Sequence, residues 1–201
     1  MAIIVNKVQK RKDIALACKD LFIQNGIKKL TISQIAKTAG VAKGSLYDYF
    51  KNKEDIVFEI VDILMEEHNI TKEKKILEAT STKDKLKIFF QFYYDKEDID
   101  LRQLYKEFIS ISLVDTEQLM VEHHTQSFDK YYSWFEDIIK DGIKNNEIKD
   151  IALRLAKGFF VFGDGIFIAS SVTNSIDDVQ ISIDEHIDAL FELIEVKNDD
   201  H

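Results

Sequence analysis

The chain has 201 residues, of which 45% are hydrophobic and 31% are charged, and its formal net charge is -9. This composition excludes a disordered tail and supplies enough apolar residues for one domain, or for a small domain plus a larger one. The apolar run at the N-terminus is too short for a signal peptide, and no later segment has the ~20 uncharged apolar residues that a membrane span needs. We therefore expect a protein of the cytoplasm.

The spacing of apolar residues predicts an all-α fold. The chain has no proline and seven glycines, and its long stretches repeat with the 3.6-residue period of a helix. Residues 1–55 carry eleven Lys and Arg against five Asp and Glu, a net of +6, which leaves -15 for the remainder. Because exposed charges are screened over about 8 to 10 Å, a compact basic end can attract a polyanion although the whole chain is acidic. We therefore expect a basic domain over residues 1–53 and an acidic one over residues 54–201.

The first predicted helix ends near Asn25-Gly26 and carries one apolar stripe, formed by Ile14, Ala17, Cys18, Leu21 and Phe22. Cys18 is the single cysteine, so an internal disulfide is excluded and a reducing compartment is indicated. Its apolar neighbours favour a small core residue over a reactive thiol.

Two short helices follow. Thr31 can cap the first of them in a capping box with Gln34, three residues later, and Gly40 ends it. The next helix is expected from about Ala42 to Phe50. Its apolar residues Leu46 and Phe50 point inward, and its outer face carries Lys43, Ser45, Tyr47, Asp48 and Tyr49.

Two short helices joined by a tight glycine turn are typical of a helix-turn-helix, whose second helix enters the DNA major groove. A plain helical hairpin is the alternative. Two outward tyrosines argue against it, as does Gly44, which costs ~1 kcal/mol in a helix relative to alanine but lets another backbone approach. Lys51 and Lys53 follow directly. The pattern favours binding of double-stranded DNA.

The run TISQIAKTAGVAKGSLYDYFKNKEDI resembles the DNA-binding signature of the TetR family of transcriptional regulators, in which I-A-x-x-A-G-V precedes G-x-L/I-Y-x-x-F-x-x-K. The resemblance covers about the first quarter of the chain. It implies that Lys43 to Phe50 form the recognition helix and that Thr31 grips a phosphate. It also implies that Tyr47 and Tyr49 contact phosphates or thymine methyls and that Lys53 lies against the DNA backbone. Lys43, Gly44, Ser45 and Asp48 then remain to read bases.

Two positions depart from the family pattern. Ala42 stands where a serine often caps the recognition helix, so that cap is missing. Asp48 brings a negative charge to the presumed base-reading face, where it repels phosphate but can accept from cytosine N4. The alternative is that Asp48 points away from the bases and pairs with a neighbouring lysine.

The acidic remainder is expected to form about six longer helices. The TetR resemblance implies that this part binds a small-molecule effector and forms a homodimer through the last two helices, residues 151–173 and 179–196. The stretch LAKGFFVFGDGIFIASS supports this because it is apolar almost all round, with Gly158 and Gly165 as a narrow ridge for a second helix. The alternative is a buried central helix of a monomer.

Aromatic residues gather in IFFQFYYD and FDKYYSWF. Any one of them is more often a core residue, but so many large rings are hard to pack without a void, which is the usual form of a small-molecule site. The predicted wall consists of Phe89, Phe92, Tyr93, Phe108, Trp134 and Phe162, and the predicted polar contacts are His123, Gln126 and Asp164.

The sequence contains no pattern of catalytic residues, and no cofactor or metal is expected. The resulting hypothesis is a homodimeric repressor that a small apolar or aromatic effector releases from a palindromic operator. A DNA-binding scaffold of the same fold, which acts through a protein partner, is the second hypothesis. A helical enzyme or carrier is the third and the least supported.

Overall fold

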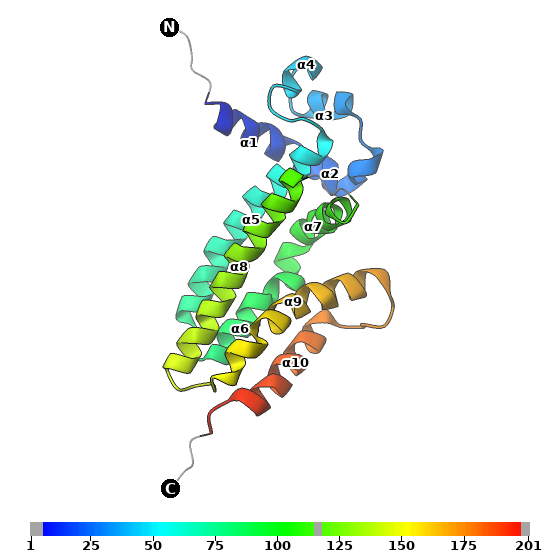
Figure 1. Ribbon diagram of the computed structural model, residues 1–201. Coiled ribbons are helices and arrows are strands. Elements are labelled where there is room, and N and C mark those ends of the chain that lie inside the picture. The colour runs from blue at the N-terminus through cyan, green and yellow to red at the C-terminus, as the bar shows by residue number, and fades with distance from the viewer. Residues whose placement is uncertain (1–5, 115–117, 198–201) are drawn as a thin grey trace. The chain divides into compact units, whose positions relative to one another are not determined.

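The computed structural model describes residues 6–114 and 118–197, and in these ranges it is built of helices (Figure 1). The prediction of an all-α fold is confirmed. None of the described helices combines the length and the apolar run that crossing a bilayer requires. The α-helices are α1 Lys7–Ala17, α2 Lys19–Asn25, α3 Ile32–Thr38, α4 Lys43–Leu46, α5 Lys53–Glu78, α6 Thr82–Phe90, α7 Ile99–Ser112, α8 Gln118–Lys144, α9 Ile151–Val172 and α10 Val179–Ile194.

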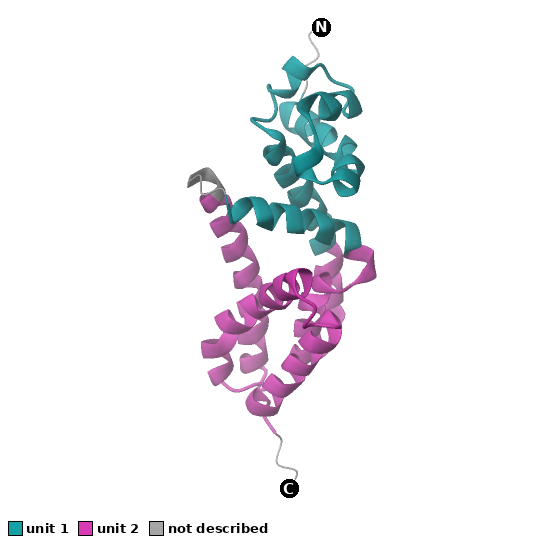
Figure 2. Ribbon diagram, turned by 90° about the vertical axis from the view of Figure 1, so that its right-hand side faces the viewer, with its two compact units in different colours: residues 1–69, 99–117 teal, residues 70–98, 118–201 magenta. Residues whose placement is uncertain are grey.

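The chain divides into two compact units, shown in different colours in Figure 2. The first unit is made from residues up to 69 and from the segment that contains α7, and the second from residues 70–98 and from residue 118 onward. Helix α5 contributes its first part to one unit and its last part to the other. The sequence predicts a different division, into a DNA-binding domain of residues 1–53 and an effector domain of residues 54–201. That functional division stays a prediction.

In the first unit, α1 and α2 replace the single first helix that the periodicity predicts. They meet at Cys18, whose N–H donates to the carbonyl of Ala15. Ala15 is buried while Ala17 is exposed, so the predicted stripe is wrong at that position. The thiol of Cys18 donates to the carbonyl of Ile35 at 3.6 Å, and burial raises its pKa to about 11. A thiol so protonated is a poor nucleophile, which confirms the expectation of a core residue.

The start of α3 is as predicted. The Thr31 hydroxyl accepts from the N–H of Gln34, and the Gln34 side chain accepts from the N–H of Thr31, which completes the capping box. Gly40 ends the turn after α3 with φ +66°, a left-handed conformation that favours glycine. The N–H of Val41 donates to the carbonyl of Ala36, which closes the corner toward α4.

Helix α4 is shorter than expected. The sequence predicts a helix from about Ala42 to Phe50, but the α-helical part ends at Leu46. The next residues continue as tight turns, in which the N–H groups of Tyr47 and Asp48 donate to carbonyls three residues back. The missing side-chain cap at Ala42 is confirmed, and a short helix with one uncapped end is consistent with that loss.

In the second unit, α6, α8, α9 and α10 pack on one another around a core of aromatic and branched side chains. Phe90, Phe135, Ile183 and Ile187 are completely buried there. The six longer helices that the sequence predicts correspond to α5 to α10, and the last two end within two residues of their predicted limits.

Gly163 lies where α9 approaches the residues that end α6. A methyl group on this glycine would meet ring atoms of Tyr93 at 2.5 Å and of Phe90 at 2.7 Å. We expect Gly163→Ala to lower the free energy of unfolding by about 2 kcal/mol, because buried rings must move to admit the methyl group. Denaturant unfolding measures this loss. Gly165→Ala is the control, since a methyl group there meets nothing within 4 Å. Equal stability of the two variants would contradict the packing described.

Candidate DNA interface and ligand site

The outer face of α4 and of the turn that follows is open to solvent. Lys43, Gly44, Ser45 and Asp48 are exposed, and Tyr47 is 53% exposed. On the other face Leu46 and Phe50 are at most 2% exposed and belong to the core that also contains Ile35 and Ala36 of α3. Inward apolar residues therefore hold a polar outer face in place, as the sequence predicts.

Arg11 of α1 ties this element to α5, a role that the sequence does not signal. Its Nε donates to Glu59 at 2.6 Å, its guanidinium donates to the carbonyl of Tyr49, and the same group lies 4.2 Å from the centre of the Phe50 ring. All three contacts are with residues far along the chain, so no local pattern could reveal them.

The predicted phosphate-contacting residues differ in their exposure. Thr31 is exposed, whereas Tyr49 is half-buried and packs against the core. The Lys53 ammonium donates to the carbonyls of Ile27 at 2.8 Å and Leu30 at 3.3 Å. Lys53 thus holds the segment before α3 and has one N–H left for a phosphate, so its replacement would disturb folding as well as DNA binding.

Asp48 has no side-chain hydrogen bond or ion pair to any described residue, 6–114 or 118–197. The alternative in which it pairs with a neighbouring lysine therefore finds no support in this structure. An exposed carboxylate without an internal partner is available to accept from a base.

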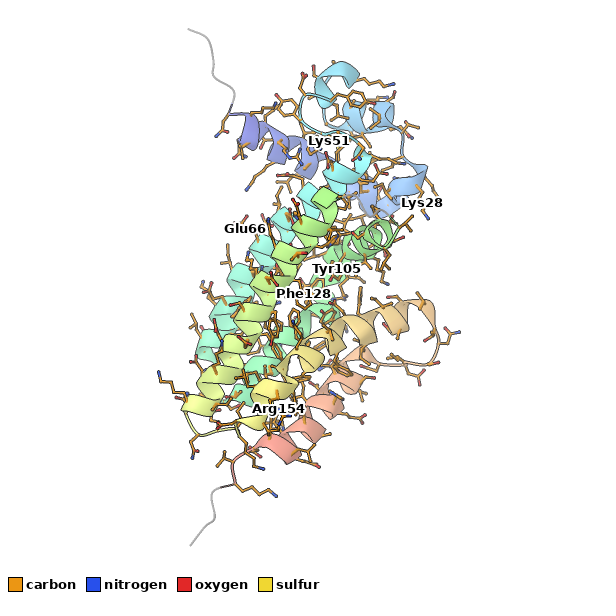
Figure 3. The ribbon with its side chains drawn as sticks, viewed as in Figure 1. Lys28, Lys51, Glu66, Tyr105, Phe128 and Arg154 are labelled. Carbon is orange, nitrogen blue, oxygen red and sulfur yellow. The ribbon has the colours of Figure 1, made fainter. Side chains whose placement is uncertain are left out.

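Several basic side chains of the first unit are open to solvent. Lys28, Lys29, Lys37, Lys43 and Lys51 are exposed, and none of the five forms an ion pair within the described ranges. Figure 3 labels Lys28 and Lys51 among the side chains of this unit. Ammonium groups that are not neutralised internally can attract phosphates.

Residues 14–60 match the family model described as bacterial regulatory proteins of the tetR family. The fatty acid metabolism regulator protein of Bacillus subtilis is 30% identical over 160 residues, which are 78% of this chain and 80% of that protein. The chain belongs to the TetR family. The resemblance read from Thr31 to Ile56 is thereby confirmed, and the protein is a DNA-binding transcriptional regulator with a helix-turn-helix domain and a helical ligand-binding domain. The regulators it resembles have a non-enzymatic role.

Other relatives and structures agree with this family. The transcriptional regulator QacR of Staphylococcus aureus is 26% identical over 158 residues, covering 72% of this chain and 80% of that one. The structure of the regulator FadR of Bacillus subtilis with stearoyl-CoA has a TM-score of 0.64 and 25% identity, over 87% of this chain and 96% of that chain. A transcriptional regulator from Saccharomonospora viridis with choline has a TM-score of 0.75 at 17% identity, over 95% of this chain and all of that one, which shows the shared fold.

In the second unit of this TetR-family protein, most of the predicted ligand-site residues come together. Phe89 and Trp134 lie with ring centres 5.5 Å apart, and the Tyr93 hydroxyl donates to Asp164 at 2.8 Å. Phe92 lies edge-on to Tyr93. Rings from α6, α8 and α9, with Phe128 among them (labelled in Figure 3), therefore form one connected aromatic cluster.

Four predicted residues lie apart from this cluster or at its margin. Phe108 belongs to the first unit, where it packs on Phe58 and Tyr105. Gln126 is exposed, and the ring of His123 lies against that of the adjacent His124. Phe162 stacks on His186 of α10, with ring centres 3.9 Å apart.

Within the described ranges, no three His, Cys, Asp or Glu side chains come together in a way that could hold a metal ion.

Lys72, near the end of α5, is a residue of this cluster that the sequence does not reveal. Its side chain is 5% exposed, and its ammonium lies 4.9 Å from the ring centre of Phe89 and 5.6 Å from that of Trp134. Burial lowers the pKa of Lys72 to about 8, although the negative charge of Asp98 acts in the other direction and raises it. In the segment TKEKK the sequence does not distinguish Lys72 from the exposed lysines Lys74 and Lys75.

The outer face of α9 carries apolar side chains that are exposed in the single chain. Leu155, Val161 and Ile168 are each about 40% exposed, and Val172 is 75% exposed. Methyl groups placed on Gly158 and Gly165 would meet nothing within 4 Å. The inner face of the same helix, which includes Ala156, Phe159 and Phe167, is buried.

Gly44 offers a test of the surface that we expect to meet DNA. We expect Gly44→Ala to keep or raise thermal stability, because a methyl group there meets nothing within 4 Å and alanine favours the helix by ~1 kcal/mol. DNA affinity should nevertheless fall at least tenfold, since the methyl group stands where DNA would approach the backbone. Fluorescence anisotropy with labelled DNA measures the affinity. Unchanged affinity would show that another face meets DNA.

Proposed function

We propose that this protein is a homodimeric, cytoplasmic repressor whose two recognition elements enter successive major grooves of a palindromic operator. The observation that carries the proposal is the outer face of α4, where exposed Lys43, Tyr47 and Asp48 are held over a buried Leu46 and Phe50. In this proposal residues 1–53 bind DNA and residues 54–201 bind the effector and form the dimer.

Each exposed residue has a distinct role in the proposal. Thr31, Tyr47, Tyr49 and the remaining N–H of Lys53 contact the DNA backbone and fix the orientation of the protein. Lys43, Gly44, Ser45 and Asp48 read bases in the major groove, with Asp48 accepting from cytosine. Replacement of Asp48 should therefore change operator preference more than overall affinity.

The exposed face of α9 supports a second copy of the chain as the partner. Its apolar side chains alternate with Gly158 and Gly165 at helical spacing, which suits close approach of another helix. Ile181 and Leu193 of α10, which packs beside α9, are also exposed. Half-sites of B-DNA recur every ~34 Å, so a dimer with two-fold symmetry matches a palindromic operator.

The aromatic cluster supports a small apolar or aromatic effector. Tyr93, Asp164 and Lys72 place polar groups among rings, which is the usual composition of a small-molecule site. The FadR structure contains stearoyl-CoA, so a regulator of related sequence takes a ligand with a long apolar chain in this fold. Effector and operator binding would oppose one another by the same factor in both directions.

Selection of genomic fragments by the purified protein tests the proposal. Wild-type protein should recover a short inverted repeat upstream of a few genes, and Gly44→Ala should recover it poorly. Recovery of no specific sequence would overturn the proposal. Recovery of a repeat whose binding no small molecule changes would instead favour the scaffold that acts through a protein partner.

A further inference from the structure

The ammonium of Lys72 lies inside the aromatic cluster without a direct counter-ion. In the described parts of the chain it forms no ion pair or hydrogen bond, and it lies over the faces of the Phe89 and Trp134 rings. Lys75, one turn away in α5, is exposed. It forms an ion pair with Asp95 and donates a hydrogen bond to the side chain of Gln91. The buried lysine and the exposed one therefore have different surroundings.

A buried ammonium without a close carboxylate is costly to hold. Burial of a charge is unfavourable unless it is paired, and two aromatic faces offset only part of that cost. Asp98 favours the charged form, but the effect of burial is larger, since the pKa still falls. Methionine or leucine would fill the same space without this cost. The position is therefore better suited to receiving a charge than to stabilising the fold.

We propose that Lys72 is the anchor for the anionic group of an amphiphilic effector, whose apolar body packs on the surrounding rings. The inference deepens the proposed function, because it rests on the presence of an effector in the second unit and names its chemical class. An anion at Lys72 would replace the missing counter-ion in a site of low dielectric constant, where such a pair is strong.

The side chains around Lys72 indicate the chemical class of the effector. The ring of Phe89, which faces Lys72, also lies 5.2 Å from that of Phe135 and 6.1 Å from that of Phe160, centre to centre. None of these three side chains carries a polar group, so these surroundings suit an acyl chain better than a sugar or a peptide. A related regulator is named for fatty acid metabolism, and the FadR structure holds stearoyl-CoA. The anion on Lys72 is thus either the carboxylate of a free fatty acid or a phosphate of an acyl-coenzyme A.

Trp134 provides the measurement, because it is the single tryptophan of the chain and lies beside Lys72. Full-length protein is titrated with decanoate and decanoyl-CoA below their micelle concentrations and with 1-decanol below its solubility limit. Binding is followed by Trp134 fluorescence and by calorimetry. We expect decanoate or decanoyl-CoA to bind at least tenfold more tightly than 1-decanol. Binding of decanoate alone identifies the free acid, and binding of decanoyl-CoA alone identifies the thioester.

Lys72→Met decides the role of the ammonium. It should retain the fold and the binding of 1-decanol but lose the preference for the anion. Lys74→Met, the same change at an exposed position of α5, should behave as wild type. Wild-type preference in Lys72→Met, or tighter binding of 1-decanol by the wild type, would overturn the inference. If no probe binds while operator recovery succeeds, the inference fails and the DNA-binding role stands.

Discussion

Replacing both Gly158 and Gly165 by lysine is expected to convert the protein into a folded monomer. Both glycines lie on the outer face of α9, and a Cβ atom added at either position meets nothing within 4 Å in the same chain. Lysine also favours a helix more than glycine does, so the helix itself should gain stability. In the proposed dimer, however, two ammonium groups on each copy would be forced between apolar helices.

The expected loss of association is large. Burying unpaired charges costs several kcal/mol, and every 1.4 kcal/mol changes a dissociation constant tenfold, so dimerisation should weaken by roughly 100-fold or more. Sedimentation velocity measures the mass of the protein, and circular dichroism measures its helix content. Binding to a DNA fragment with both half-sites should fall together with dimerisation.

Ser133→Lys is the control for this experiment, because it adds a lysine to an exposed position of α8, away from the proposed interface. It should remain a dimer. If the double glycine variant sediments as a dimer, the outer face of α9 is not the interface, and the exposed residues of α10 would be examined next.

Lys72→Met is expected to raise the free energy of unfolding by about 2 kcal/mol at pH 7. The pKa of Lys72 falls from 10.5 to about 8 on folding, and each unit of such a shift corresponds to about 1.4 kcal/mol. Loss of the two ring contacts offsets about 1 kcal/mol of the gain.

The gain should shrink as the pH rises. Between pH 8 and pH 10.5 the unfolded wild-type chain binds more protons at Lys72 than the folded chain does, so wild-type stability increases across this window. Methionine does not titrate, so the difference between the two proteins should be full below about pH 8 and small near pH 10.5. Urea unfolding at pH 7 and at pH 10, at one fixed protein concentration, measures both values.

Lys74→Met controls for the loss of a charge at the surface and should change stability by less than about 0.5 kcal/mol. A gain from Lys72→Met that is equal at both pH values would show that packing, and not the buried charge, accounts for it.

Local features of the sequence predict the DNA-binding element well. The capping box of Thr31 and Gln34, the turn at Gly40 and the inward pair Leu46 and Phe50 all involve residues within a few positions of one another. Such features depend on backbone geometry and helical periodicity, which the order of residues already contains. The sequence nevertheless predicts a longer recognition helix than the structure has, because periodicity alone does not distinguish a helix from a run of tight turns.

Local pattern is less informative about individual side chains that act at long range. Lys53 suits a phosphate contact by its position in the motif, yet its ammonium binds the carbonyls of Ile27 and Leu30. Phe108 resembles the other aromatic residues, yet it packs in the first unit. Arg11 has no special place in the pattern, although it joins α1 to Glu59 and Phe50.

The sequence by itself thus determined the helical class, the helix-turn-helix and the face that it presents, because each follows from residues close together in the chain. Only the tertiary structure decided which helices surround a given side chain. Lys72 shows the difference most clearly, since Lys72 and Lys74 stand in one charged run, and one is buried among rings while the other is exposed. The environment of a side chain, and hence its pKa and its possible ligand, is set by neighbours that packing brings from elsewhere.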